Sequence, residues 1–284
     1  MRGAARIKLS ILSFACATLP SIAVGETVRF PAATTPPTAL QQRLFQERGQ
    51  PIPARPGVEL IGELFRPSGN GKFPAVVMLH GCNGRSSRAS EDESGAYFAS
   101  LGYVLLIVDS FGPRGIVERC ATSSGTPSDM LMDAFGALLY LASLPFIDED
   151  RIALLGFSQG GEVALSAVKL GGVGSQFERQ FRAAVAYYPQ CEVSMGGASV
   201  PTLVLIGELD ELTPAKLCQE MMARRSGAGA ELRLVVYPGA HHAFNSVRLR
   251  NRPEYFFGHL EYNEEAHRAA LQETVAALRA AFGQ

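Results

Sequence analysis

The sequence carries no excess of charge of either sign. Its 284 residues include 26 Lys and Arg and 27 Asp and Glu, a formal net charge of −1 at pH 7. Nucleic-acid-binding proteins usually gather Lys and Arg along one face or helix, and the sequence contains no such cluster. We therefore expect no nucleic acid among the partners.

Long apolar runs are absent after residue 25. A membrane-spanning helix needs about 20 consecutive apolar residues, and no later run reaches that length. We expect no stable membrane insertion of residues 26–284. Internal repeats are absent as well, and no second domain boundary is apparent, so the sequence predicts one large domain.

The first 25 residues differ from the rest. Basic residues within the first eight positions precede an apolar run from Leu9 to Val24, and the small residues Ala23 and Gly25 close the segment. This order is typical of a secretory signal peptide. Residues 1–25 are therefore predicted to be a signal peptide cleaved after Gly25, with export to the periplasm or the extracellular space. An uncleaved anchor is the alternative, but Pro20 interrupts a run that is already short for a spanning helix.

Cysteine is scarce, and its number fits export. Cys16 lies in the predicted signal peptide, and the residues before it match a lipoprotein signal poorly. Four cysteines remain, an even number that suggests two disulfides in an oxidising compartment, with three possible pairings. Buried free thiols are the alternative. The four are Cys82, Cys120, Cys191 and Cys218.

Two regions follow the predicted signal peptide. Residues 26–57 contain six prolines and one strand-like piece at 27–30, which predicts an irregular N-terminal arm lying over the domain. From residue 58 to 284, short apolar runs alternate with helical patterns. Some runs, such as 75–79 and 104–108, are apolar without alternation, as in strands that are covered on both faces.

This alternation predicts an α/β fold with a mostly parallel central sheet and helices on both faces. Ligands of such sheets bind beyond the carboxyl ends of the strands, so the loops there are where chemistry is expected. The predicted strands are 58–65, 74–80, 103–109, 152–156, 183–188, 202–207 and 232–237. The predicted helices are 93–101, 129–143, 160–170, 214–225 and 262–281.

The sharpest motif is Gly156-Phe157-Ser158-Gln159-Gly160, followed by Gly161. It comes directly after a predicted strand and directly before a predicted helix. In a nucleophile elbow, small flanking residues let the strand and the helix approach, and the helix N-terminus points at the developing negative charge. A tight turn is the alternative, but the position between strand and helix favours the elbow. We predict Ser158 as the nucleophile.

Candidate partners of this serine follow two later strands. Asp210 and Glu208 follow the strand 202–207, and His241 and His242 follow the strand 232–237. Asp210 is preferred as the orienting acid because it lies past the strand end, where the loop can turn toward a histidine; a capping role is the alternative for an acid before a helix. Motif position assigns His242 as the general base and His241 as its neighbour.

A fourth motif, His80-Gly81-Cys82-Asn83-Gly84, follows the strand 74–80. Acyl transfer generates an oxyanion, which two backbone N–H groups usually stabilise. We expect these donors to be the N–H groups of Gln159 and Cys82. A plain turn is the alternative. His80 has no second His or Cys at ligand spacing and no carboxylate nearby, so no metal site is predicted.

These residues together resemble the dienelactone hydrolase family of the α/β-hydrolase superfamily. The resemblance covers about residues 58–282 and runs through 78–84, 108–115, 156–161 and 237–244. It implies hydrolysis of a small-molecule ester or lactone through an acyl-enzyme, without a cofactor. The founding lactone hydrolases are cytosolic and use a cysteine nucleophile. This chain departs from them in having Ser158 and a predicted signal peptide.

The fold implied by the resemblance also suggests how the cysteines pair. The strands 74–80 and 103–109 are neighbours in that fold, and Cys82 and Cys120 lie on the loops that follow them. Cys191 and Cys218 likewise follow two neighbouring strands. The predicted bridges are therefore Cys82–Cys120 and Cys191–Cys218.

Arg114 lies on the loop after the strand 103–109. It is a candidate for binding a carboxylate on the substrate. Pairing with Glu118 or with solvent is the alternative, as for any surface arginine.

Other functions are compatible with the same motifs. A peptidase or an acetyl-carbohydrate esterase can use the same three residues on the same fold. An exported, non-catalytic binding module is a candidate of another class. Loss of one of the three residues would favour the binding module, and none is missing.

Overall fold

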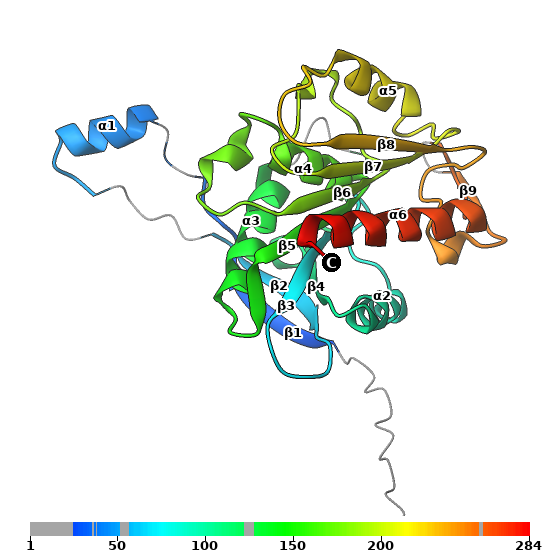
Figure 1. The fold of residues 1–284 in the computed structure, drawn as a ribbon, viewed down its shortest axis with the longest axis horizontal. Coiled ribbons are helices and arrows are strands. Elements are labelled where there is room, and N and C mark those ends of the chain that lie inside the picture. Colours follow the sequence, from blue (N-terminus) through cyan, green and yellow to red (C-terminus); the bar gives the residue numbers. More distant parts are fainter. Residues whose placement is uncertain (1–24, 36, 38, 52–56, 122–127, 256–257) are drawn as a thin grey trace, which may run out of the picture.

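The computed structural model describes residues 25–35, 37, 39–51, 57–121, 128–255 and 258–284. The predicted signal peptide and Cys16 lie outside the described residues, apart from Gly25. Figure 1 shows one central, twisted sheet with helices packed on both of its faces.

The sheet has eight strands in the order β1-β2-β4-β3-β5-β6-β7-β8. Strand β2 is antiparallel to both of its neighbours, and the pairs from β4 to β8 are all parallel. This arrangement confirms the predicted fold class. The strands are β1 (Glu26–Pro31), β2 (Glu59–Phe65), β3 (Phe73–Leu79), β4 (Val104–Asp109), β5 (Ile147–Phe157), β6 (Ala183–Tyr187), β7 (Thr202–Gly207) and β8 (Leu232–Tyr237).

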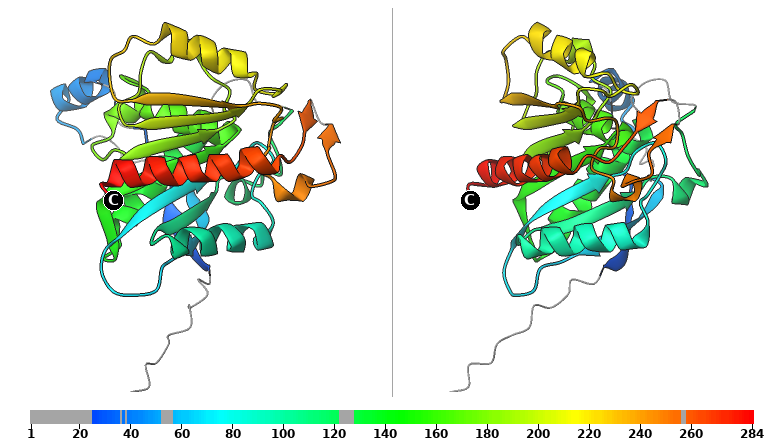
Figure 2. Two further views of the ribbon diagram at one scale, coloured as in Figure 1. Left: turned by 45° about the vertical axis from the view of Figure 1, so that its right-hand side comes forward. Right: turned by 90° about the vertical axis from the view of Figure 1, so that its right-hand side faces the viewer.

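Helices α3 and α4 cover one face of the sheet, and α2 and α6 cover the other, while α5 lies beside the edge strand β8 (Figures 1 and 2). A two-stranded ribbon, β9 (Glu254–Tyr255) and β10 (His259–Leu260), lies near the start of α6. The helices are α1 (Ala39–Glu47), α2 (Arg88–Ser100), α3 (Ser128–Ser143), α4 (Gln159–Val168), α5 (Ala215–Arg224) and α6 (Glu264–Phe282). Short 3₁₀ helices cover Gly112–Arg114, Val173–Gln176, Val193–Met195 and Val247–Leu249.

The N-terminal arm differs from the prediction of an irregular segment lying over the domain. Strand β1 pairs with β2 and forms one edge of the sheet. Its side chains alternate over the second half of the strand, so that Val28 and Phe30 are buried, whereas Arg29 between them and Pro31 after them are exposed. Helix α1 projects away from the sheet (Figure 1). The edge position explains why β1 can end in Pro31. A proline has no backbone N–H to donate to a neighbouring strand, and an edge strand has a neighbour on one side only.

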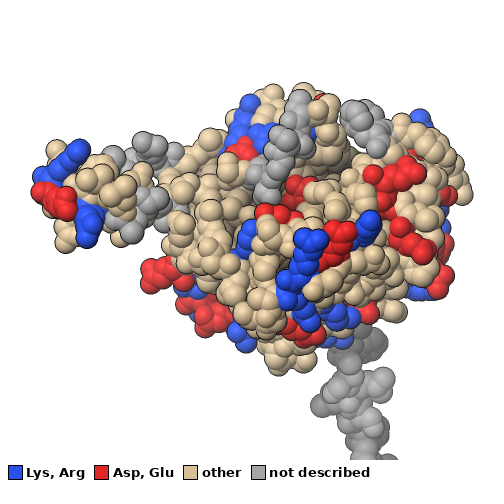
Figure 3. Space-filling model, turned by 90° about the horizontal axis from the view of Figure 1, so that it is seen from above, with Lys and Arg blue, Asp and Glu red and all other residues tan. Residues whose placement is uncertain are grey.

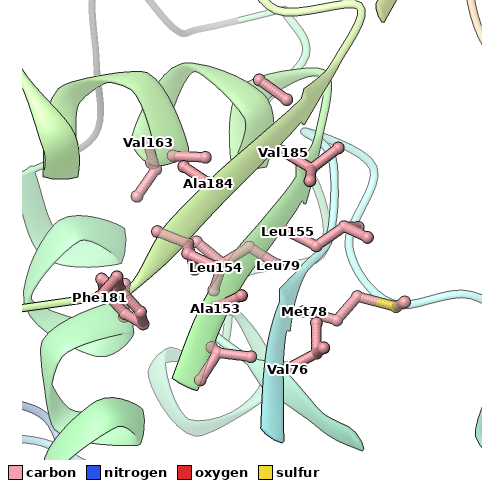
Figure 4. Packing of buried hydrophobic residues seen from close by; sticks show 14 of the residues in the cluster. Val76, Met78, Leu79, Ala153, Leu154, Leu155, Val163, Phe181, Ala184 and Val185 are labelled. Carbon is pink, nitrogen blue, oxygen red and sulfur yellow. The ribbon is translucent and has the colours of Figure 1, made fainter. Parts of the chain in front are cut away.

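The core lies between the central strands and the helices that cover them. Figure 4 shows Val76 of β3, Leu154 of β5 and Val163 of α4 among its members, and each of these side chains is fully buried. Full burial of one such side chain contributes about 1.5–3 kcal/mol. The packed core therefore holds the carboxyl ends of β3, β5, β7 and β8 in a rigid frame.

The surface agrees with the balanced composition. On the face shown in Figure 3, basic and acidic side chains lie interspersed. Among the described residues, no helix is long and apolar enough to cross a membrane.

Candidate active site

Ser158 lies on the sharp turn between β5 and α4. Its backbone angles are φ 52° and ψ −115°, in the left-handed half of backbone space that non-glycine residues rarely occupy. The turn is possible because its neighbours are small. A Cβ atom on Gly156 would lie 2.0 Å from the carbonyl oxygen of Gly160. One on Gly160 would lie 2.6 Å from the carbonyl oxygens of Leu79, the last residue of β3, and His80. This is the geometry of a nucleophile elbow.

The structure brings Ser158, His242 and Asp210 together. The Oγ atom of Ser158 lies 3.1 Å from Nε2 of His242, and Nδ1 of His242 lies 2.8 Å from Oδ2 of Asp210. His242 and Asp210 are buried, whereas Ser158 is partly exposed. Glu208, the competing acid, accepts the N–H of Gly239 at 2.9 Å instead. A chain of contacts from serine to imidazole to carboxylate is what general-base activation of a nucleophile requires.

Thr213 completes this arrangement, and the sequence analysis did not identify it. Its hydroxyl lies 2.9 Å from Oδ2 of Asp210 and 3.2 Å from Nδ1 of His242. Oδ1 of the same carboxylate accepts the backbone N–H groups of Leu212 and Thr213 at 3.0 and 2.9 Å. Asp210 is therefore held from both oxygens. A threonine three residues after an aspartate is the local signal that could have indicated this turn.

The loop after β3 lies against the nucleophile. A Cβ atom on Gly81 would be 3.4 Å from the Cβ of Ser158. The turn is closed by the N–H of Gly84 donating to the carbonyl of Gly81 at 3.1 Å, and the carbonyl of Cys82 accepts the N–H of Arg119 at 2.7 Å. Gln159 is the first residue of α4, where the helix offers no acceptor for its N–H. Both expected oxyanion donors thus belong to segments that adjoin Ser158.

The side chain of His80 connects this loop to the residue after β4 by hydrogen bonds. Its Nε2 accepts the backbone N–H of Ser110 at 3.2 Å, which leaves Nδ1 to donate to the carbonyl of Gly81 at 2.8 Å. Burial lowers the pKa of His80, because a charged imidazolium is disfavoured away from water. A neutral His80 therefore joins the end of β4 to the loop after β3.

The four described cysteines form two disulfides. Cys82 is bonded to Cys120 with a Cα–Cα distance of 4.8 Å, and Cys191 to Cys218 with a distance of 4.9 Å. This is the pairing expected from the neighbouring strands. The first bridge joins the loop after β3 to the loop after β4, and the second joins the loop after β6 to α5.

Arg114 is paired within the protein. Its two terminal nitrogens donate to the two carboxylate oxygens of Asp133 at 2.8 and 2.7 Å, and one of them also lies 2.6 Å from the carbonyl of Ser110. Asp133 is fully buried on α3, and a buried carboxylate needs a bound partner. Arg114 therefore anchors the loop to α3, and its role in binding a substrate carboxylate stays a prediction. Glu118, the alternative partner, accepts the N–H of Cys120.

An aromatic side chain packs against the imidazole of His242. The Tyr188 ring packs edge-on against His242 with 4.6 Å between ring centroids, and its hydroxyl donates to Oδ1 of Asn245 at 2.7 Å. Burial raises the pKa of Tyr188 well above its ordinary value, so the phenol stays neutral. Gln159 is also buried, and among the described residues its side-chain amide has no hydrogen-bond partner.

A large surface depression lies elsewhere. It has a volume of about 1320 Å³, and its lining includes Glu149 near the start of β5, Arg182 just before β6 and Phe282 at the end of α6. Ser158 follows the opposite end of β5. Ligands of such sheets bind at the carboxyl ends of the strands, so we take the Ser158 edge as the candidate site.

The strand order and the serine elbow between β5 and α4 define the α/β-hydrolase fold. The dienelactone hydrolase family profile matches residues 60–282, and the chain belongs to this family. Its members hydrolyse esters and lactones, and the chain is accordingly an ester-hydrolysing enzyme by family.

Individual relatives are distant. A curated Bradyrhizobium protein named "Probable 2-oxo-3-(5-oxofuran-2-ylidene)propanoate lactonase" is 26% identical over 212 residues, which cover 66% of this chain and 80% of that protein. An uncharacterized Mycobacterium tuberculosis protein is 28% identical over 236 residues, 76% of this chain and 79% of its own length.

Solved structures share the fold at lower identity. A Klebsiella pneumoniae structure assigned to the dienelactone hydrolases has a TM-score of 0.60 at 20% identity, covering 89% of this chain and 98% of the other. Esterase 2 of Thermogutta terrifontis, solved after phosphorylation by paraoxon, has a TM-score of 0.59 at 19% identity, with coverages of 78% and 89%.

Proposed function

We propose that this protein is an exported serine hydrolase that cleaves an ester or lactone bond through an acyl-enzyme. The observation that carries the proposal is the contact chain from Ser158 Oγ through the His242 ring to the Asp210 carboxylate, at 3.1 and 2.8 Å. The lactonase among the relatives supports the choice of bond. No cofactor enters the mechanism.

The reaction begins with proton transfer. His242 takes the Ser158 proton at Nε2 as the serine oxygen attacks the carbonyl carbon, and Asp210 stabilises the imidazolium that forms. The alcohol leaves with a proton from His242. Water then attacks the acyl-enzyme with His242 again as base, which releases the acid and restores Ser158.

Stabilisation of the oxyanion falls to the N–H groups of Gln159 and Cys82. Loss of one such donor costs about 2.7–4 kcal/mol of transition-state stabilisation. The bridge from Cys82 to Cys120 and the hydrogen bond from Arg119 to the Cys82 carbonyl hold this part of the loop. Preorganised donors are effective because they need no reorientation as the charge develops.

Export rests on the N-terminal sequence and on the disulfides. Two disulfides, and no membrane-crossing helix among the described residues, are compatible with an exported protein. N-terminal sequencing of the protein recovered from the periplasm or the medium should find Glu26 as the first residue. Recovery of the protein only from the cytosol would contradict export.

A fluorophosphonate probe tests the nucleophile. The probe should label the wild type and the matched control Ser166→Ala, which removes a serine from the same helix, and should not label Ser158→Ala. The same three proteins are then assayed on p-nitrophenyl acyl esters of increasing length, on a lactone and on a peptide p-nitroanilide. Cleavage of the anilide alone would favour a peptidase, and labelling of Ser158→Ala would refute the assignment.

A further inference from the structure

A second cluster of polar side chains lies beside the proposed catalytic residues. His241 immediately precedes His242 in the loop after β8. His259 belongs to β10, and Glu261 follows that strand. Leu260 forms an isolated parallel bridge with His242, so the ribbon of β9 and β10 is attached to the loop that carries the proposed base.

The three side chains converge. The rings of His241 and His259 lie 3.8 Å apart between centroids, inclined at 39°. Nε2 of His259 lies 3.1 Å from a carboxylate oxygen of Glu261. One potential ligand atom from each of the three residues lies within 4.8 Å of the others, and all three residues are partly buried.

Hydrogen bonding within the chain does not account for this cluster. Nδ1 of His241 and Nε2 of His259 are both buried, and among the described residues neither has a hydrogen-bond partner of acceptable geometry. Buried ring nitrogens are normally satisfied by protein or water. One buried ring nitrogen without a hydrogen-bond partner among the described residues, beside a second that faces only a carboxylate, is the arrangement of donor atoms that a cation site requires.

The ligand set selects the kind of ion. Two imidazoles and one carboxylate bind Zn²⁺ and other divalent first-row transition metals, with a fourth position left for water. Ligand atoms around tetrahedral Zn²⁺ lie about 3.3 Å apart, so these residues need only a small inward movement. The surroundings limit the rotation of His259, because the Tyr255 ring stacks on it at 4.7 Å and its backbone N–H donates to Glu211 at 3.1 Å.

We propose that His241, His259 and Glu261 bind one divalent transition-metal ion, with Zn²⁺ as the ion to test first. The ion would join the loop after β8 to the ribbon and would lie outside the contact chain of Ser158, His242 and Asp210. The proposal does not depend on the hydrolytic function, because it concerns binding alone.

Calorimetric titration of Zn²⁺ into tag-free protein, previously treated with a chelator and dialysed, tests the proposal. We expect one site per chain, and at least tenfold weaker binding in His241→Ala and in His259→Ala. The control His267→Ala removes the histidine of α6 and should bind like the wild type. Asp210→Asn should also bind like the wild type. It changes the carboxylate beside His242, which is the alternative binding site for an ion, and leaves the proposed site intact.

Cu²⁺ provides a second readout that loss of folding would not imitate. Its electron paramagnetic resonance spectrum should show two coordinated nitrogens in the wild type and one in His241→Ala, with circular dichroism verifying that each variant is folded. Absence of Zn²⁺ binding by the wild type would overturn the proposal. Unchanged binding in both histidine variants, or loss of binding in Asp210→Asn, would overturn it as well.

Discussion

Glu162 offers a quantitative test of the environment around the elbow. It lies in the first turn of α4, and its backbone N–H donates to the carbonyl of Ser158 at 3.0 Å. Burial raises the pKa of its carboxyl from 4.5 to about 7, and a backbone hydrogen bond from Gln190 only partly opposes the shift. The carboxyl has therefore been placed where its charged form is poorly solvated.

The sign of the effect on stability follows from proton binding. Between pH 4.5 and about 7 the folded protein holds a proton on Glu162 that the unfolded chain has released. The contribution of this residue to the free energy of unfolding therefore falls as pH rises through that window and is constant above it. The difference between the two pKa values corresponds to about 3 kcal/mol, an upper limit because the side chain is partly exposed.

Glu162→Gln removes the ionisation and keeps the shape of the side chain. We expect the variant to match the wild type at pH 4.5 and to be more stable at pH 8 by up to about 3 kcal/mol. Urea unfolding at several pH values measures this difference, in which the titration of all other groups cancels. Glu178→Gln, at an exposed glutamate, serves as the control and should follow the wild type throughout.

Two results would refute this reasoning. A Glu162→Gln variant less stable than the wild type at pH 8 would mean that the charged carboxylate makes a favourable contact. A difference that does not change between pH 4.5 and 8 would mean that Glu162 titrates alike in the folded and unfolded chains.

Three further predictions follow from the site. His242→Ala should lower kcat on an ester by about 10⁴-fold or more and His241→Ala by far less, as steady-state kinetics will show; equal losses would mean that the wrong ring was assigned. Replacing Cys82 and Cys120 together by serine should lower the free energy of unfolding by up to about 4 kcal/mol, measured by urea unfolding, because the bridge closes a span of 38 positions; a cost near zero would contradict it. Gly160→Ala should destabilise the fold strongly in thermal unfolding, because its Cβ would lie 2.6 Å from two backbone carbonyls; an unchanged melting temperature would contradict the tight elbow.

Most strands of the fold could be predicted from local sequence patterns. The apolar runs predicted β2 through β8 to within a few residues, except that β5 begins at Ile147, five residues before the predicted start. Residues 147–151 include three acids and an arginine, which do not resemble a buried strand. Strand β1 was recognised as strand-like but not as part of the sheet, because its partner β2 lies about 30 residues away and only pairing reveals an edge strand.

The meeting of Ser158, Asp210 and His242 was also predictable. Each follows a strand of a mostly parallel sheet, and the carboxyl ends of such strands share one edge. The disulfide partners could be predicted only with the family resemblance, which implied which strands are neighbours and therefore which loops lie together.

Tertiary structure alone decided the contacts that no local pattern encodes. Arg114 pairs with Asp133 because helix α3 buries that carboxylate under the loop, 19 positions along the chain. His241 meets His259 because the ribbon bridges back onto the loop after β8. The sequence by itself determined which residues end the strands, since strand patterns and small turn residues are local. Which polar side chains these loops bring face to face depends on burial and on long-range packing, which exist only in the folded chain.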